Sequence, residues 1–203
     1  MTTGAASGNG TANAVTFISG TTATKLLWPE NSIPSTFTVC SVTRYTGGQR
    51  GRILTCMGSP DQPVNWLHGH AHGNYRGVAF YSWAEWVTPH TQSVGVLDDW
   101  LVMCGTNALA TAPGNIILDQ SMIGAGNGPA SGGGGGQLNI NYYDAESSDW
   151  AMHSLFIWNY SLGTVPAPWH TRPCLSNLVA GSDDVALSMV RFRDAWNCCP
   201  RAG

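Results

Sequence analysis

The first residues that could perform chemistry are three histidines that alternate with small residues in the segment His68-Gly-His70-Ala-His72. On a β-strand, alternate side chains share one face, so these imidazoles would lie close enough to bind a transition metal. The neighbouring glycines and Asn74 favour a loop instead, in which the histidines are hydrogen-bonding groups, and we therefore expect no metal here. Further ligands would have to come from Asp61, Glu85 or His90.

Three aspartates, Asp98, Asp99 and Asp119, offer the hard oxygen ligands that Ca²⁺ prefers. No Asp-x-Asp-x-Asp-Gly loop fixes them in a calcium-binding arrangement. Serine and histidine are plentiful, yet no Gly-x-Ser-x-Gly segment marks a nucleophile. The sequence therefore predicts no cofactor, with Ca²⁺ as the alternative.

Tryptophan is unusually frequent, with nine residues in the chain. Large aromatic side chains fill the cores of β-sandwiches, and we expect most of the nine to do so. The others could form exposed flat faces on which sugar rings stack. The candidate glycan-binding residues are Trp66, His68, His70, Trp83 and Trp86.

The six cysteines fall into two groups. Cys40, Cys56 and Cys104 each lie inside an apolar run, which is typical of buried free thiols. The other three lie among proline and arginine near the end of the chain, where disulfides are favoured: Cys174, Cys198 and Cys199. Spacing alone assigns no pairing, and an even count without Cys-x-x-C favours an oxidising compartment over a zinc site.

Two Asn-x-Ser/Thr triplets, at Asn9 and Asn159, are candidate glycosylation sites and agree with a secretory route. No stretch of 18 apolar residues is present, so the sequence predicts no membrane span. We expect an extracellular or cell-surface protein.

Charged residues make up only 10% of the chain, and the net charge is -3. Such a surface attracts neither nucleic acid nor anionic lipid. A neutral surface rich in hydroxyl and amide groups suits a secreted protein or one that packs against copies of itself.

Short apolar runs alternate with Gly, Pro and Asn turns from Val15 onward, a pattern typical of an all-β sandwich or barrel. Strands are expected over residues 15–18, 23–28, 37–45, 52–56, 77–81, 100–104, 115–119, 137–141 and 150–158. The run Gly132–Gly136 has neither the Gly-Lys-Ser/Thr sequel nor the helix of a phosphate loop, and is read as a hairpin connection.

Both ends of the chain differ from this middle part. Residues 1–13 have the composition of a flexible tail, so order there would require contact with its own domain or with a neighbouring copy. Near the other end, an acidic N-cap at Ser182 and apolar residues at helical spacing predict a helix over 183–196. We divide the chain into an N-terminal arm (1–14), a β-sandwich (15–170) and a cysteine-bearing extension (171–203).

The order of the middle strands resembles that of the concanavalin A-like and laminin-G-like group of lectins and glucanases. The segments that carry the resemblance, within residues 36–162, are Asp99–Gly105, Asn115–Gly124, Gln137–Asn141 and Asp149–Leu162. The resemblance implies a two-sheet antiparallel jelly roll. It implies no single function, because the group includes lectins, glucanases, adhesion modules and structural subunits.

Glucanases of this group carry paired carboxylates on one strand, in the pattern Glu-x-Asp-x-x-Glu. The chain has one segment with that spacing, Asp144-Ala-Glu146-Ser-Ser-Asp149, but its acid types are reversed. The segment also precedes the closing strand instead of lying within it, so we expect a solvated turn and no enzyme.

Three functions remain open. The first is a non-catalytic structural subunit that associates with itself into a filament or surface layer, in which the arm adds a strand to a neighbour's sheet. The second is a carbohydrate-binding lectin or adhesion module. The third is a glycoside hydrolase of the glucanase type, for which catalytic carboxylates are lacking.

Overall fold

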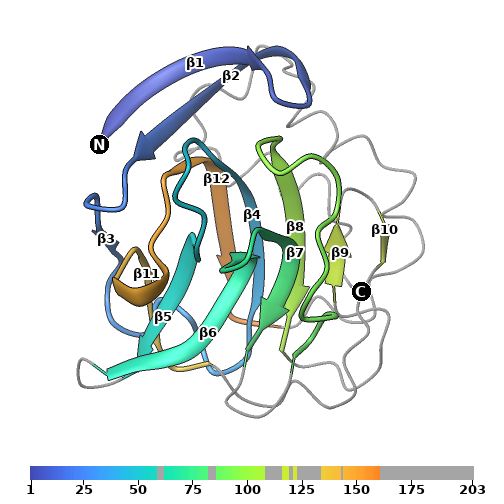
Figure 1. The fold of residues 1–203 in the computed structure, drawn as a ribbon. Coiled ribbons are helices and arrows are strands. Elements are labelled where there is room, and N and C mark those ends of the chain that lie inside the picture. The colour runs from blue at the N-terminus through green and yellow to red at the C-terminus, as the bar shows by residue number, and fades with distance from the viewer. Residues whose placement is uncertain are drawn as a thin grey trace.

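The computed structural model describes residues 1–58, 62–81, 86–107, 116–118, 121–122, 134–142 and 144–160. Within these ranges the chain is all-β, with one 3-10 turn, η1 (Asp144–Glu146), and two antiparallel sheets that face each other (Figure 1). The predicted class, an all-β antiparallel two-sheet fold, is therefore confirmed. The helix expected over 183–196 lies outside the described residues, as does the whole cysteine-bearing extension (171–203).

One sheet has seven strands and contains both the first and the last strand of the described chain. In spatial order they are β1 (Thr2–Gly8), β2 (Thr11–Gly20), β12 (Trp150–Trp158), β4 (Thr38–Tyr45), β8 (Leu101–Thr106), β9 (Ile116–Leu118) and β10 (Ser121–Met122). The opposite sheet has five strands, in the order β3 (Leu26–Leu27), β11 (Gln137–Ile140), β5 (Leu54–Gly58), β6 (Gln62–Ala71) and β7 (Tyr75–Phe80).

The main core lies between the two sheets and is formed by the inward-facing side chains of alternate strand residues. On β4 these are Val39 and Tyr45, which pack with residues of both sheets and are fully buried. Burial of each large apolar side chain stabilises the fold by roughly 1.5–3 kcal/mol. The buried partners from the rest of the chain include Leu54, Trp66, Leu101, Leu138, Ile140 and Trp150.

The opposite face of the seven-stranded sheet carries a second cluster, in which Val15 of β2 packs with Val42, Trp100 and Ala151. The guanidinium of Arg44 lies 5.2 Å from the centre of the Trp100 ring. The tip of the β1–β2 hairpin is fixed nearby, because the backbone N–H of Trp100 donates to the carbonyl oxygen of Asn9 over 2.9 Å.

The arm expected over residues 1–14 therefore belongs to the sheet of its own molecule (Figure 1). Its expected boundary falls inside β2, and the flexible tail suggested by composition is instead strand β1. Pairing with β2 supplies the contact that orders these small polar residues.

Each of the nine expected strands overlaps an observed strand, and several are displaced by one to four residues at their ends. The strand expected over 150–158 agrees with β12 at both ends, and the strand expected over 37–45 agrees with β4 within one residue. Two long strands were not predicted, β1 and β6, of which β6 includes the segment interpreted as a histidine loop.

Candidate functional site

The candidate glycan residues Trp66, His68 and His70 lie on β6 and point between the two sheets. Their exposed fractions are 1%, 0% and 0%, because alternate residues of this strand all face the core. A ligand at the surface cannot reach them. These three candidate glycan residues are therefore part of the core in this structure.

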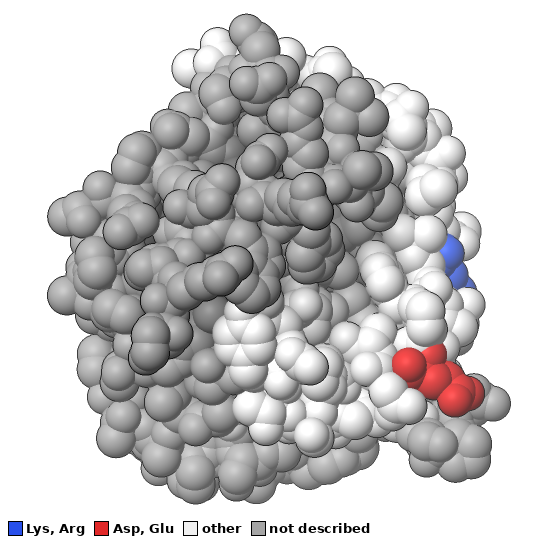
Figure 2. All heavy atoms as spheres, turned by 180° about the vertical axis from the view of Figure 1, so that it is seen from behind, with Lys and Arg blue, Asp and Glu red and all other residues white. Residues whose placement is uncertain are grey.

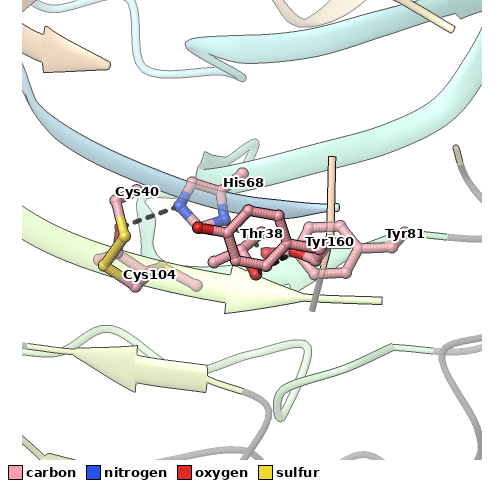
Figure 3. Close-up of a disulfide and its surroundings, with 7 residues drawn as sticks. Thr38, Cys40, His68, Tyr81, Cys104 and Tyr160 are labelled. Atoms are coloured by element: carbon pink, nitrogen blue, oxygen red, sulfur yellow. Dashed lines mark hydrogen bonds between the residues drawn. A yellow bond between two sulfur atoms is a disulfide. The ribbon is translucent and has the colours of Figure 1, made fainter. Parts of the chain in front are cut away.

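His68, which lies beside the disulfide in Figure 3, uses both ring nitrogens in hydrogen bonds. Nε2 lies 3.2 Å from the carbonyl oxygen of Met103, and Nδ1 lies 2.6 Å from the hydroxyl of Tyr81. A carbonyl oxygen only accepts, so Nε2 carries the proton and Nδ1 accepts from the Tyr81 hydroxyl. Burial lowers the pKa of His68 to about 4 and raises the pKa of Tyr81 well above its ordinary value, so both groups stay neutral.

His70 lies two residues after His68 on β6, and its side chain faces β4. Its Nδ1 lies 3.4 Å from the hydroxyl of Thr43, and its ring meets the Tyr45 ring edge-on at 4.5 Å. Burial lowers the pKa of His70 well below its ordinary value, and the charges of Arg76 and of a protonated His68 act in the same direction. The pair is thus a neutral polar layer inside the sandwich.

The third histidine, His72, is separated from the other two. It is exposed in the turn between β6 and β7, so the three imidazoles do not share one face. Across the described ranges, no three His, Cys, Asp or Glu side chains lie close enough together to hold a metal ion. Of the further ligands considered, Asp61 and Glu85 lie outside those ranges, and His90 contacts the Trp86 ring.

The segment with glucanase spacing lies in the turn before β12, as predicted. The carboxylate of Glu146 accepts from Nε of Arg52 at 2.5 Å, and the Arg52 side chain is only 8% exposed. Asp149 accepts from the backbone N–H groups of Thr22 at 3.2 Å and Gln49 at 3.3 Å. Both carboxylates therefore hold loops in place.

The described aspartates considered for calcium also contact other parts of the molecule. Asp98 accepts two hydrogen bonds from the guanidinium of Arg50, at 2.8 and 2.9 Å. Asp99 lies against the hairpin tip at Gly10, and Asp119 lies outside the described residues.

Of the two remaining candidate tryptophans, Trp86 is half-buried and Trp83 lies outside the described residues. The Trp86 ring packs edge-on against Phe80 at 5.3 Å and lies 5.9 Å from the ring of His90. Trp86 is thus the one candidate glycan residue that is both described and partly accessible.

Cys40 and Cys104 form a disulfide that joins β4 to β8 (Figure 3). The expectation of free thiols at these two positions is wrong, because the strand register places them directly opposite each other. Cys56 agrees with the expectation: it is a buried free thiol, and burial raises its pKa to about 12. The disulfide candidates Cys174, Cys198 and Cys199 lie outside the described residues.

The candidate glycosylation sites Asn9 and Asn159 are both exposed. Asn9 occupies the turn of the β1–β2 hairpin with a φ of 52°, a left-handed conformation that asparagine tolerates. The hydroxyl of its partner Thr11 donates to the carbonyl oxygen of Gly8 at 2.9 Å.

A feature that the sequence did not reveal is the outward edge of β1, meaning the side of Thr2–Gly8 that faces away from β2. We call it the β1 edge. No described strand pairs with it, and every residue of β1 except Gly4 is exposed. Open edges of this kind present unpaired backbone N–H and C=O groups and are sites of strand addition.

The other sheet edges are short or covered. In the described chain, β3 and β10 each have two residues. The outer side of β7 is covered by the segment 86–94. There the backbone N–H of Val87 donates to the carbonyl oxygen of Ala79 at 2.9 Å, and that of Val94 donates to the carbonyl oxygen of Arg76 at 3.1 Å. The β1 edge is therefore the long open edge of the described structure.

Charge is scarce around this edge. The first charged side chain in the sequence is Lys25, so neither strand of the hairpin carries one. On the face seen in Figure 2, the described surface is mostly uncharged, with acidic and basic atoms near one margin. Natural edge strands usually carry charge or proline that prevents pairing, and β1 has neither.

No protein-family model matches the chain, and no curated protein matches its sequence. Among the described residues, no helix is long and apolar enough to cross a membrane.

Proposed function

We propose that the chain is a non-catalytic structural subunit of extracellular type, which associates with copies of itself through an open sheet edge. The observation that carries this proposal is the β1 edge, a seven-residue strand with exposed residues, no charge and no proline. Added strands bind such an edge through backbone hydrogen bonds, which require no particular side chains.

The charge distribution supports association between copies. With 12 acidic and 9 basic residues, the net charge is -3 over 203 residues, so electrostatic repulsion between identical molecules is weak. No charged side chain precedes Lys25, so neither strand of the β1–β2 hairpin contributes a side-chain charge that would repel a second copy at the β1 edge.

The roles of the candidate chemical groups support a structural function over catalysis. Glu146 pairs with Arg52, Asp98 pairs with Arg50, and His68 is buried and neutral. A general acid or base must reach a substrate, whereas these groups bind neighbouring elements of the same molecule.

The Cys40–Cys104 disulfide supports an extracellular setting, because disulfides persist mainly in oxidising compartments. The two-sheet architecture also agrees with the resemblance to the concanavalin A-like and laminin-G-like group, and we propose a jelly roll of that group as the scaffold.

A concentration series measured by size-exclusion chromatography with light scattering tests the proposed function. We expect the mass to rise with concentration, and we expect removal of β1 to abolish the rise. Leu27→Lys is a matched control, because it places a charge on the two-residue edge strand β3, where the side chain is 46% exposed. A wild-type chain that stays monomeric throughout would overturn the assembly function.

A second candidate, glycan binding, is favoured by one observation: Trp86 is partly accessible and has His90 beside it. A sugar ring could stack on the indole while the imidazole supplies a hydrogen bond. Binding to a glycan array that is lost in Trp86→Ala and retained in Trp28→Ala would support it, since Trp28 packs against the main core instead. Absence of binding to every glycan would reject it.

A further inference from the structure

We propose that the β1 edge pairs antiparallel with the β1 edge of a second copy about a two-fold axis centred on Gly4, so that the basic unit of assembly is a closed dimer. This inference rests on the proposed function and specifies its partner, geometry and register.

The backbone of β1 is prepared for such pairing. On one side it pairs with β2, in the regular register from Thr2 opposite Ser19 to Ala6 opposite Val15. In an antiparallel ladder, residues whose N–H and C=O point to one neighbour alternate with residues whose groups point the other way. Alternate residues of β1 therefore direct both groups toward the open side.

The symmetry follows from the nature of the edge. An antiparallel pair formed by two identical strands has a two-fold axis, so each residue that contacts its partner is contacted in return. Such an interface uses the β1 edge of both copies and leaves none for a third. Growth into a filament or layer would then require a second surface, and β1 alone yields a dimer.

The register follows from the length of the regular segment. The ladder between β1 and β2 is irregular between Ala6 and Gly8, which leaves Thr2 to Ala6 as the uninterrupted part. The two-fold pairing that uses this whole segment is centred on Gly4. It places Thr3 opposite Ala5 of the second copy and Thr2 opposite Ala6.

The side chains also permit this register. Gly4 lies over the Phe17 ring, where an added Cβ would come within 2.9 Å of Cζ. Thr3 and Ala5 point to the opposite face of the strand and are exposed. Small uncharged residues face one another across the axis, so the two backbones can approach without steric or electrostatic cost.

Charge exchange at two positions tests both the partner and the register. In Thr3→Lys/Ala5→Lys, the pairing puts lysine opposite lysine twice, and in Thr3→Glu/Ala5→Glu it puts glutamate opposite glutamate twice. We expect each variant alone to dimerise about tenfold more weakly than the wild type. We expect an equimolar mixture of the two to recover association, because every lysine then faces a glutamate.

The readout is sedimentation velocity at low ionic strength, with circular dichroism to show that each variant retains the wild-type fold. A misfolded variant would not associate with any partner. Recovery of association in the mixture therefore requires that both variants are folded. If both variants associate as strongly as the wild type, the interface lies elsewhere, which overturns the β1 pairing while the chain still associates with copies of itself. A monomeric wild type instead overturns the assembly function.

Cross-linking supplies a second test that leaves the charge unchanged. Thr3→Cys mixed with Ala5→Cys should form a covalent dimer under mild oxidation, since the two positions face each other across the axis. Thr16→Cys is the matched control, because Thr16 faces Ala5 within the same molecule, on the inner side of the hairpin. Equal dimer yields from the control and the mixture would refute the register.

Discussion

The buried histidines should make the fold sensitive to mild acid. His68 is fully buried with a pKa of about 4, against 6.5 for an unfolded histidine. Between these two values the unfolded chain binds a proton that the folded chain does not. Stability is therefore present above pH 6.5 and is lost as the pH falls toward 4.

The size of the loss follows from the difference between the two pKa values. One pKa unit corresponds to about 1.4 kcal/mol, so the full contribution of His68 is about 3 kcal/mol. Lowering the pH from 7 to 5 removes about 2 kcal/mol of this stability, since the unfolded histidine is then almost fully protonated. For a domain of this size, the unfolding temperature should fall by about 4–8 °C.

His70 should add to the loss in the same direction, because its pKa also lies well below the ordinary value. The groups around it offer no compensating negative charge: Arg76 is cationic, and Thr43 and Tyr45 are neutral. Burial also raises the pKa of Tyr45, so that its hydroxyl stays protonated.

The assay is urea unfolding at pH 7 and pH 5 for the wild type and for His68→Phe. The substitution lowers stability at both pH values, because it leaves the Tyr81 hydroxyl without its partner. The pH dependence is the informative quantity, and it should decrease by about 2 kcal/mol in the variant. His72→Gln is the control, because that side chain is exposed in the folded protein and should leave the pH dependence unchanged.

Two results would refute the argument. The first is a pH dependence equal in His68→Phe and the wild type. The second is a nuclear magnetic resonance titration in which the folded His68 protonates near pH 6.5, the value for an unfolded histidine.

Three further variants test the packing. Replacing Cys40 and Cys104 together by serine opens a connection of 64 residues and should lower the free energy of unfolding by about 4 kcal/mol, measured in denaturant without reductant; an unchanged value would contradict the cross-link. Gly51→Ala would push a Cβ into the backbone oxygen of Glu146 and should cost about 1–3 kcal/mol, visible as a lower unfolding temperature. Asn141→Ala should cost about 3 kcal/mol in the same assay, because the buried amide bonds three backbone carbonyls and one N–H; a variant as stable as the wild type would exclude that role.

Among the strands that could be predicted from the sequence are β12 and β4, which are apolar runs bounded by turn residues. Both strands contribute to the main core on one face and to smaller apolar clusters on the other. The turn before β12 was equally predictable, because acidic and serine residues there interrupt the apolar pattern.

β6 was missed for a local reason. Gly69 has a φ of +95° and lies at a shift in register between β6 and β7, so a strand passes through residues that usually mark a loop. The burial of His68 and His70 could not be inferred from their type, since histidine is common both in cores and at surfaces.

The disulfide was missed for a different reason. Cys40 and Cys104 are 64 residues apart, and their pairing depends on the alignment of β4 with β8. A one-residue shift in that register would place the two side chains on opposite faces and exclude the bond. No local pattern in the sequence encodes such an alignment.

β1 could not be predicted from the residue pattern, because neither of its faces lies in the core. Its order comes from backbone pairing with β2 and from the contact of Gly4 with Phe17, neither of which requires apolar residues at alternate positions. Because these contacts require no particular side chains, the strand can remain uncharged at the long open edge of the described structure. The composition that suggested a flexible tail is thus the property that equips this strand to bind another copy, and charge introduced at Thr3 and Ala5 tests that link directly.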